Sequence, residues 1–261
     1  MRQRTSKSPP VVLSIAGYDP SSGAGITADI KTMAAHGCYG ITCVTALTIQ
    51  STRGVKRVQV LGGNAISETL AELEFDFKIA AVKIGMLGSA EAARAVAAFL
   101  RRARPRHVVL DPMIQSSSGA RLISREGMTV LKRELLPLAT VITPNIDEAA
   151  AFSALRVSNA EQMQAAAAVL HHMGAKAVII TGGHLQPAVD LVSMEKDILW
   201  LRGKHIKTRS THGTGCAFST ALACHLAKGR TLQSAAQAAK KFVEQSLGTA
   251  PKVGKGTGPV I

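Results

Sequence analysis

Short apolar segments of strand length alternate with helical segments along most of the 261-residue chain. The first apolar segment, residues 11–16, leads into a loop rich in Gly, Pro and Ser, and residues 26–36 then show helical spacing. The same order recurs, with further strands predicted at residues 41–47, 79–84, 107–110, 140–142 and 177–180. Repetition of this kind produces parallel strands covered by helices. The sequence therefore predicts the α/β class, as a three-layer α/β/α domain with a mostly parallel central sheet.

The remaining segments predict helices and one hairpin. Helical spacing is found at residues 65–73, 89–102, a segment that ends near residue 136, and then 147–153, 160–173, 216–227 and 232–247. Residues 198–206 predict a β-hairpin that turns at Arg202-Gly203. Because no linker or repeat interrupts this pattern, we expect a single domain over residues 11–261. Residues 1–10 are expected to form a flexible polar tail.

Composition limits what the protein can bind. Hydrophobic residues make up 46% of the chain and charged residues 18%, which is typical of a globular domain. Aromatic residues, at 3%, are too few for the stacking platforms that single-stranded nucleic acid requires. The formal net charge is +14, but most of the excess is scattered or lies at helix ends. We therefore expect no specific nucleic-acid partner.

The sequence also indicates where the protein acts. No apolar run is long enough to span a membrane, and the opening residues lack the apolar stretch of a signal peptide. The four cysteines form no CxxC pair and fit no zinc spacing. We expect no membrane association, and reduced thiols in a cytoplasmic protein.

Residues of chemical interest follow the ends of the predicted strands. They are Asp19, Gln50, Met86, Asp111, Asn145 and the turn Gly182-Gly183. In sheets of this type, ligands bind at the carboxyl ends of the strands. This shared position favours a functional role for each of them over a purely structural one.

The segment Gly213-Thr214-Gly215-Cys216 opens the predicted helix near the end of the chain. Two glycines around one small residue can expose consecutive backbone N–H groups at a helix N-terminus, where the helix dipole also attracts anions. The same position should favour the thiolate of Cys216. A glycine turn before a core helix, with Cys216 as a small buried side chain, is an equally good interpretation of this motif alone.

Two acidic residues are candidate metal ligands. Asp111 ends a predicted strand, where a carboxylate is most commonly a cap. It could also hold Mg²⁺, which takes one or two carboxylates together with phosphate oxygens. Glu148 follows Asn145 by three positions at a helix start, so the pair is either a capping box or part of the metal site, and both roles are compatible. The P-loop pattern is absent, and the Gly17–Gly25 loop lacks the dinucleotide spacing.

Together, these motifs resemble the hydroxymethylpyrimidine/phosphomethylpyrimidine kinases, the thiamine-biosynthesis branch of the ribokinase-like superfamily. The matching segments span nearly the whole chain in order; they include residues 14–26, 45–55, 83–87, 109–113, 142–149, 182–184, 211–216 and 256–260. The resemblance implies a ribokinase-like fold and ATP-dependent phosphorylation of 4-amino-5-hydroxymethyl-2-methylpyrimidine, then of its monophosphate to the diphosphate. It also implies Mg²⁺ and a homodimer.

The resemblance assigns roles to individual residues. The amides of Gly213, Thr214, Gly215 and Cys216 would bind the transferring phosphoryl group. The Cys216 sulfur would either accept the hydroxyl proton or only position the hydroxyl. Gln50 would hydrogen-bond the aminopyrimidine edge, and Asp29 would lie near the substrate. The ring pocket would be formed by Gly17, Ala24, Met86 and Met113, although for the two methionines alone core packing is the better interpretation.

Nucleotide contacts are expected from Thr181, Gly183 and Thr214. The family often has Lys where this chain has Thr181, so charge neutralisation there should be weaker unless Lys207 or Arg209 substitutes. Two alternatives remain: a pyridoxal kinase of the same superfamily, and a catalytically silent relative that binds pyrimidine or nucleic acid as a regulator. Gln50 favours the pyrimidine over pyridoxal, and the intact Asp111, Glu148 and 213–216 loop argue against the silent relative.

Overall fold

The computed structural model describes residues 8–116, 119–183, 185, 188–195 and 197–261. Most of the expected tail, residues 1–7, and His184 of the Gly-Gly-His turn lie outside these ranges. The strands of the described residues are β1 (Val11–Tyr18), β2 (Tyr39–Ser51), β3 (Gly54–Val60), β4 (Ile79–Ile84), β5 (Val108–Leu110), β6 (Val141–Ile142), β7 (Ala177–Ile180), β8 (Val189–Met194) and β9 (Ile198–Arg202). They form one sheet in the order β3-β2-β1-β4-β5-β6-β7-β8-β9.

The central part of the sheet is parallel, from β2 through β1 and β4 to β7. Antiparallel strands extend it at both edges: β3 pairs with β2, and β8 and β9 follow β7. The helices are α1 (Gly25–Ala35), α2 (Gly63–Asp76), α3 (Ala90–Ala103), α4 (Arg125–Val130), α5 (Ile146–Ser153), α6 (Ala160–His172), α7 (Thr214–Ala227) and α8 (Leu232–Thr249). The predicted α/β class with a mostly parallel sheet is confirmed.

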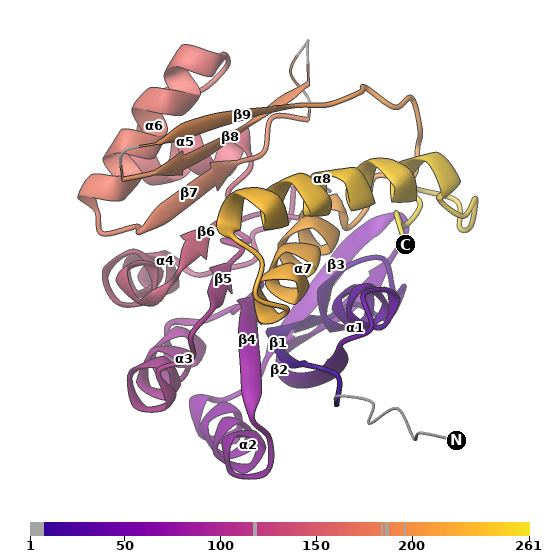
Figure 1. The fold of residues 1–261 in the computed structure, drawn as a ribbon. Coiled ribbons are helices and arrows are strands. Elements are labelled where there is room, and N and C mark those ends of the chain that lie inside the picture. The colour runs from indigo at the N-terminus through magenta and orange to yellow at the C-terminus, as the bar shows by residue number, and fades with distance from the viewer. Residues whose placement is uncertain (1–7, 117–118, 184, 186–187, 196) are drawn as a thin grey trace, which may run out of the picture.

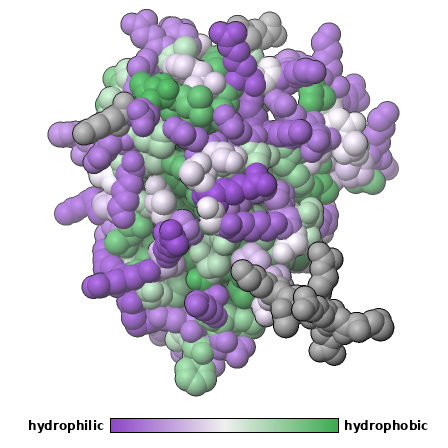
Figure 2. All heavy atoms as spheres, in the orientation of Figure 1, coloured by the Kyte–Doolittle hydropathy of each residue, from purple (hydrophilic) through white to green (hydrophobic). Residues whose placement is uncertain are grey.

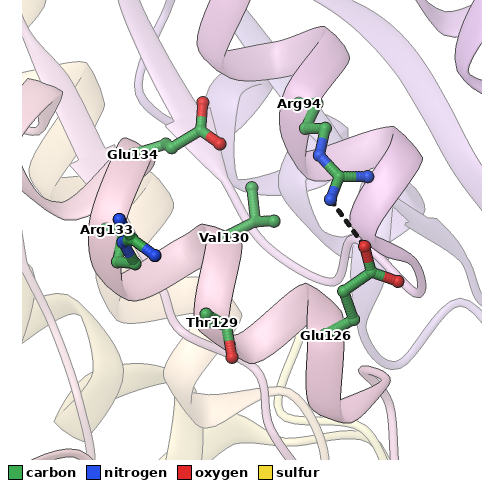
Figure 3. Close-up of a pocket in the computed structure, with 6 residues that line it drawn as sticks. All are labelled: Arg94, Glu126, Thr129, Val130, Arg133 and Glu134. Carbon is green, nitrogen blue, oxygen red and sulfur yellow. Dashed lines mark hydrogen bonds and ion pairs between the residues drawn. The ribbon is translucent and has the colours of Figure 1, made fainter.

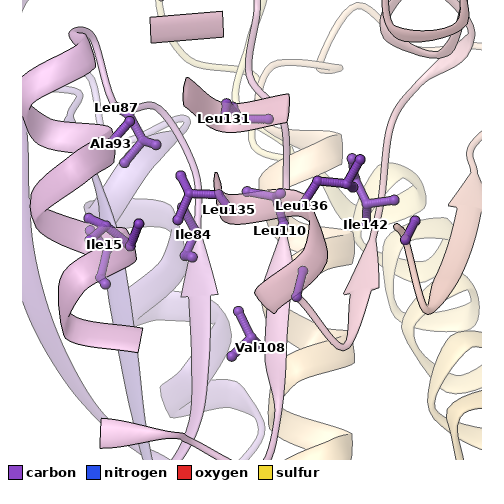
Figure 4. Close-up of a cluster of buried hydrophobic side chains, with 14 of the residues drawn as sticks. Ile15, Ile84, Leu87, Ala93, Val108, Leu110, Leu131, Leu135, Leu136 and Ile142 are labelled. Atoms are coloured by element: carbon purple, nitrogen blue, oxygen red, sulfur yellow. The ribbon is translucent and has the colours of Figure 1, made fainter. Parts of the chain in front are cut away.

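Helices cover both faces of the sheet, which gives the three layers (Figure 1). Residues of α2, α3, α5 and α6 share one apolar core with one face of the strands. Residues of α1, α7 and α8 contact the second core on the opposite face. Figure 4 shows part of the first core, where Ile84, Leu110 and Ile142 of neighbouring strands meet Leu131 and Leu135.

Helix α3 illustrates how the sequence specifies this packing. Ser89 caps it by accepting a hydrogen bond from the N–H of Ala92 at 3.1 Å, as predicted. Its buried face consists largely of alanines with Val96, Phe99 and Leu100, so the helix can approach the strands closely. Its arginines and glutamate lie on the outer side, where Arg102 pairs with Glu74 of α2 at 2.7 Å.

At the sheet edges the structure contains one strand that the sequence does not predict and one hairpin whose predicted turn is wrong. The sequence does not predict strand β3, because Lys56, Arg57 and Gln59 interrupt its valines at an edge of the sheet. The second hairpin turns between Met194 and Ile198, where Met194 and Asp197 exchange backbone hydrogen bonds, and not at Arg202-Gly203. Its first strand, β8, contains Asp190 and Ser193, and these polar residues conceal the strand in the sequence.

The segment after α4 also differs from a single helix ending near residue 136. It continues as a π-helical turn, Leu131–Leu135, and a 3₁₀ turn, Leu136–Leu138. Pro137 cannot donate the backbone hydrogen bond that an α-helix would need there.

The surface in Figure 2 carries hydrophilic side chains spread over the visible face, with smaller hydrophobic patches between them. None of the helices in the described part of the chain has the length and apolar character needed to cross a membrane.

Candidate active site

Strands β2 and β3 are added on one side of β1, and strands β4 to β9 are added on its other side. The strand order therefore reverses between β1 and β4. The helices that follow these two strands, α1 and α3, pack on opposite faces of the sheet, and ligands usually bind at the carboxyl ends of the strands at such a point. Helix α7 packs across β1, β4 and β5 at this place. The predicted residues Gly17, Met86, Asp111 and Cys216 are therefore brought to one end of the sheet.

The N-terminus of α7 has no side-chain cap. Gly213 occupies the N-cap position with a φ of 85°, a conformation that favours glycine. A Cβ atom at Gly213 would lie 1.9 Å from the carbonyl oxygen of Gly23, so the backbones of the two loops are in contact at this point. The first amides of α7 are left without a capping side chain, and an anion is their natural partner.

The Cys216 side chain lies at the N-termini of two helices. It is 3% exposed, and the N–H of Gly25, the first residue of α1, acts to lower its pKa. Helix α1 also lacks a side-chain cap, since its N-cap residue is Ala24. Burial nevertheless raises the pKa of the Cys216 thiol to about 12, with the carboxylates of Asp29 and Asp111 acting in the same direction. Desolvation therefore outweighs the helix ends, which opposes the expected preference for the thiolate.

A buried ion pair lies beneath the thiol. The Lys83 ammonium is 3.0 Å from Oδ2 of Asp29, and both side chains are 0% exposed. Asp29 also accepts hydrogen bonds from the hydroxyls of Ser14 and Thr220, the latter at 2.7 Å. Burial alone disfavours the charge on Lys83, but the carboxylates of Asp29 and Asp111 outweigh it and raise the pKa of the lysine. Lys83 is therefore a permanent positive charge at the floor of the site.

Asp111 and Glu148 are the two carboxylates predicted to bind a metal ion. Asp111 accepts a 2.9 Å hydrogen bond from Ser219 of α7, and its carboxylate lies about 4.0 Å from where a Cβ of Gly215 would be. Glu148 completes the predicted capping box with Asn145, at 3.0 and 2.9 Å. Burial raises the pKa of Glu148 to about 8, and the charge of Asp111 adds to the effect. A cation beside both groups would relieve this repulsion.

The donor set fits Mg²⁺ shared with phosphates better than a metal held by protein alone. Among the described residues, no group of three or more His, Cys, Asp or Glu side chains is arranged to hold a metal. Mg²⁺ typically takes one or two carboxylates and completes its shell with water and phosphate oxygens. Asp111 and Glu148 match that smaller requirement.

Three of the four residues predicted for the ring pocket lie in or beside one small apolar cluster. Met86 and Ala46 are buried together, and the half-buried Met113 packs against them. A Cβ at Gly17 would lie 2.9 Å from the sulfur of Met86, so the glycine leaves room for this side chain. The structure therefore brings Gly17, Met86 and Met113 together, apart from the two large cores.

The loop after β1 is joined to the segment before α7. His212 Nε2 lies 2.8 Å from Oδ2 of Asp19 and 3.0 Å from the side-chain nitrogen of Gln50. The C-terminal segment holds this histidine in place: the His212 N–H donates to the Gly258 carbonyl, and the Val260 N–H donates to the His212 carbonyl, both at 3.0 Å. Gln50 is thus fixed at the same end of the sheet as Cys216.

The predicted nucleotide residues follow β7. The Thr181 N–H donates to the carbonyl of Pro144 at 2.9 Å, and Gly183 is exposed. The Gly182 N–H donates to Asp190, whose other carboxylate oxygen is 2.7 Å from the Lys240 ammonium of α8. Asp190 therefore links Lys240 to the Thr181-Gly182 turn. Lys207 and Arg209, the substitutes suggested by the sequence, are exposed.

A separate surface cavity of about 450 Å³ lies between α3 and α4 (Figure 3). Its lining includes Glu134 and the ion pair of Arg94 with Glu126. None of the predicted site residues lines it.

Sequence reasoning did not assign roles to several residues of this site. The clearest is Lys83, a charged residue inside the apolar strand β4, a pattern that signals a buried partner. His212, Ser219 and Thr220 gave no comparable signal, because their partners lie between 108 and 193 positions away along the chain.

An α/β/α fold with an uncapped, glycine-initiated helix facing buried carboxylates is the architecture of a ribokinase-like small-molecule kinase. The family model described as phosphomethylpyrimidine kinase matches residues 19–261, and the chain belongs to this family.

Individual relatives agree. The chain is 41% identical over 255 residues to the hydroxymethylpyrimidine/phosphomethylpyrimidine kinase of Haemophilus influenzae, covering 95% of this chain and 94% of that protein. It is also 41% identical over 251 residues to the thiamine biosynthesis bifunctional protein ThiED of Geobacter sulfurreducens. That match covers 95% of this chain but only 51% of the bifunctional protein.

Solved structures share the fold. The phosphomethylpyrimidine kinase of Clostridium difficile 630 superposes with a TM-score of 0.81 at 33% identity, covering 91% of this chain and 99% of that one. The pyridoxal kinase of Staphylococcus aureus in complex with AMP-PCP and pyridoxal gives a TM-score of 0.87 at 29% identity, covering 96% and 92%. The expected family and ribokinase-like fold are confirmed.

Proposed function

We propose that this protein transfers the γ-phosphoryl group of ATP to the hydroxymethyl group of 4-amino-5-hydroxymethyl-2-methylpyrimidine, and then phosphorylates the monophosphate, in thiamine biosynthesis. The observation that carries the proposal is the uncapped N-terminus of α7, with Gly213 at its start and the Asp111 carboxylate beside it. The names of the relatives and of the family model support the same reaction.

Phosphoryl transfer requires positioning and charge neutralisation more than covalent chemistry. The amides from Gly213 to Cys216 would hold the transferring group, and the positive end of the α7 dipole would stabilise its charge. Asp111 and Glu148 would hold Mg²⁺, which supplies positive charge to the phosphates when it is bound. Ser219 orients Asp111 through its 2.9 Å hydrogen bond.

Cys216 would position the substrate hydroxyl rather than ionise. A general base works best with a pKa near the working pH, and the pKa of this thiol is about 12. Lys83 and Asp29, which lie beneath it, would act through Cys216 and the amides and not by touching the substrate, since neither side chain is exposed.

The pyrimidine ring would bind beside Gly17, Ala24, Met86 and Met113, with Gln50 at its polar edge. The apolar cluster around Met86 supports this placement, because an aromatic ring gains from contact with polarizable sulfur. The triphosphate would extend toward Thr214, Thr181 and Gly183. Lys240 is a better candidate than Lys207 for the missing cation, since Asp190 links Lys240 to the turn whereas Lys207 is exposed.

Pyridoxal phosphorylation is the second candidate activity, because a pyridoxal kinase with pyridoxal bound shares this fold at 29% identity. We also propose a homodimer in the cytoplasm. Leu47 and Ile49 of β2 are 38% and 42% exposed beside the edge strand β3, and a second copy would cover such side chains. The four free cysteines suit a reducing compartment.

The proposal is tested by incubating the protein with MgATP and either hydroxymethylpyrimidine or pyridoxal, and following ADP release and phosphorus NMR side by side. We expect the monophosphate and then the diphosphate of the pyrimidine. Folded protein that yields neither product from the pyrimidine would refute the proposal. Light scattering in solution tests the dimer separately.

A further inference from the structure

The neighbours of Gln50 determine which way its side-chain carboxamide is oriented. Gln50 is half-buried and lies between two side chains: its nitrogen is 3.0 Å from His212 Nε2, and its oxygen is 3.1 Å from the Thr48 hydroxyl. The nitrogen and oxygen of a carboxamide have nearly the same shape, so only the neighbours decide which end is which. Both neighbours have further partners that fix what they can offer.

His212 must donate through Nε2. The same nitrogen lies 2.8 Å from Oδ2 of Asp19, which is nearly buried and also accepts hydrogen bonds from the N–H groups of Ser21, Gly23 and Ala24. Burial alone raises the pKa of Asp19, but the hydrogen bonds from His212 and Ser21 outweigh it and leave the pKa below its usual value. Asp19 is therefore an ionised carboxylate that can only accept, and the proton lies on Nε2 of His212.

Thr48 must accept from Gln50. Its hydroxyl has a single hydrogen and lies 3.0 Å from the carbonyl oxygen of Tyr18, which can only accept. Once that hydrogen is used, the Thr48 oxygen offers only lone pairs to Gln50. An amide oxygen placed against it would give two acceptors in contact, whereas an amide nitrogen would give a hydrogen bond.

The two sides agree. A protonated Nε2 of His212 has no lone pair for the Gln50 nitrogen, so its single hydrogen, directed at Asp19, can be shared only with the Gln50 oxygen. An accepting Thr48 requires the Gln50 nitrogen. We infer that His212 and Thr48 fix the polarity of the Gln50 carboxamide, with its oxygen toward His212 and its nitrogen toward Thr48, and thereby determine which ring edge the site accepts. Both are positioning residues, because they act through Gln50.

The fixed polarity has a consequence for recognition. Gln50 keeps one N–H and one oxygen lone pair for a ligand, in a set order. An aminopyrimidine edge offers a complementary pair, an amino group that donates beside a ring nitrogen that accepts. The corresponding 4-oxo pyrimidine, with a carbonyl beside a ring N–H, offers the reverse pair. Because Gln50 cannot turn over without losing both of its protein partners, the oxo ring is rejected. This inference rests on the proposed function.

The scaffold holds the arrangement firmly. The His212 backbone is bonded on both sides to the C-terminal segment, through Gly258 and Val260. Its ring also lies against Gly23, where a Cβ atom would come within 2.2 Å of the ring carbon Cδ2. The ring is therefore held against the loop after β1 while it contacts Gln50.

Polarity can be measured directly in the wild-type protein by NMR. We expect nuclear Overhauser effects between the Gln50 side-chain amide hydrogens and the Thr48 methyl group. Effects to the ring hydrogens of His212, with none to Thr48, would overturn the inference. This measurement requires no substrate, so its outcome is independent of the proposed function.

Specificity is measured as the ratio of kcat/KM for the 4-amino pyrimidine to that for its 4-oxo analogue. Thr48→Val removes the acceptor at nearly constant volume, and we expect the ratio to fall about ten-fold or more, mainly through KM for the amino compound. Thr48→Ser should restore it. His212→Phe should lower the ratio in the same direction if the variant folds, as judged by its melting temperature.

Failure of the proposed function and failure of this inference give different experimental results. A wild-type enzyme that phosphorylates neither pyrimidine refutes the proposed function and leaves the NMR test of polarity intact. An active wild type whose ratio and KM are unchanged in Thr48→Val refutes the specificity role of the network.

Discussion

The helices of this protein begin in two different ways. Helices α3, α4, α5, α6 and α8 start with a side-chain cap, from Ser89, Ser124, Asn145, Asn159 and Thr231. Helices α1, α2 and α7 start without one. Of these three, α1 and α7 meet at Cys216. A cap satisfies the first amides of a helix and stabilises the fold, whereas an open start leaves those amides to a ligand. The two uncapped starts that meet at Cys216 lie in the candidate site, although the division is not complete: uncapped α2 contains no predicted site residue, and capped α5 has Glu148 in its first turn.

The largest effect is expected from closing the open end of α7. Gly213→Ala would place a Cβ against the carbonyl of Gly23 in a backbone conformation that favours glycine. We expect kcat/KM to fall by about a hundred-fold or more, as when a single oxyanion-hole donor is lost. Steady-state kinetics measures this, with circular dichroism as the check on folding. Near wild-type activity in a folded variant would mean that the α7 amides do not hold the phosphoryl group.

Helix α5 allows capping and catalysis to be separated at a single start. Glu148→Gln can keep the capping box while removing the charge, and Asn145→Ala removes the cap while keeping the carboxylate. We expect Glu148→Gln and Asp111→Asn to lower turnover about ten-fold to a hundred-fold and to raise the Mg²⁺ requirement. Asn145→Ala should instead lower the melting temperature. If the Mg²⁺ dependence of turnover is unchanged from wild type in Glu148→Gln and Asp111→Asn, as it should be in Asn145→Ala, the two acids have only structural roles.

Cys216 tests whether the converging helix ends activate a thiol. With a pKa of about 12, the thiol stays protonated between about pH 6 and 9, so turnover over that range should not follow its ionisation. Cys216→Ser should retain activity within about ten-fold. The measurement is kcat against pH for both proteins. A slope of one in the wild type that disappears in Cys216→Ser would identify a thiolate base.

Thr181 lies where the family often has a lysine that contacts the nucleotide phosphates. If charge neutralisation is incomplete there, Thr181→Lys should raise turnover by up to about ten-fold. Lys240→Ala and Lys207→Ala, each alone and combined with Thr181→Lys, identify the substitute cation. Rescue of Lys240→Ala by the new lysine would assign that role to Lys240. If none of these variants alters turnover, the Lys-to-Thr difference has no catalytic meaning.

The smallest effect on turnover is expected at a capped helix. Thr231→Ala removes the cap of α8 and should cost about 0.5–2 kcal/mol of stability with no change in kcat/KM. Chemical denaturation and kinetics on the same sample measure both quantities. Loss of activity at matched folded fraction would contradict the division between the two kinds of helix start.

Much of this arrangement could be predicted from the sequence, because the informative patterns are local. Strand and helix alternation, the Asn145–Glu148 box and the 213–216 loop each occupy a few consecutive residues. The edge strands β3 and β8 were concealed by polar side chains. The state of Cys216 was also beyond sequence reasoning: the helix start is local, but the burial and the carboxylates that reverse its effect come from distant segments.

The buried pair of Lys83 and Asp29 has a consequence for how such a chain can change over time. Removing one partner leaves an unpaired charge in the interior, which typically costs about 3–5 kcal/mol, whereas replacing both by apolar residues is often tolerated. A lineage can therefore leave this state only by a double substitution or through an unstable intermediate. Positions 29 and 83 lie 54 residues apart in the sequence. They are expected to covary across homologous sequences, because substitution of either residue alone is destabilising.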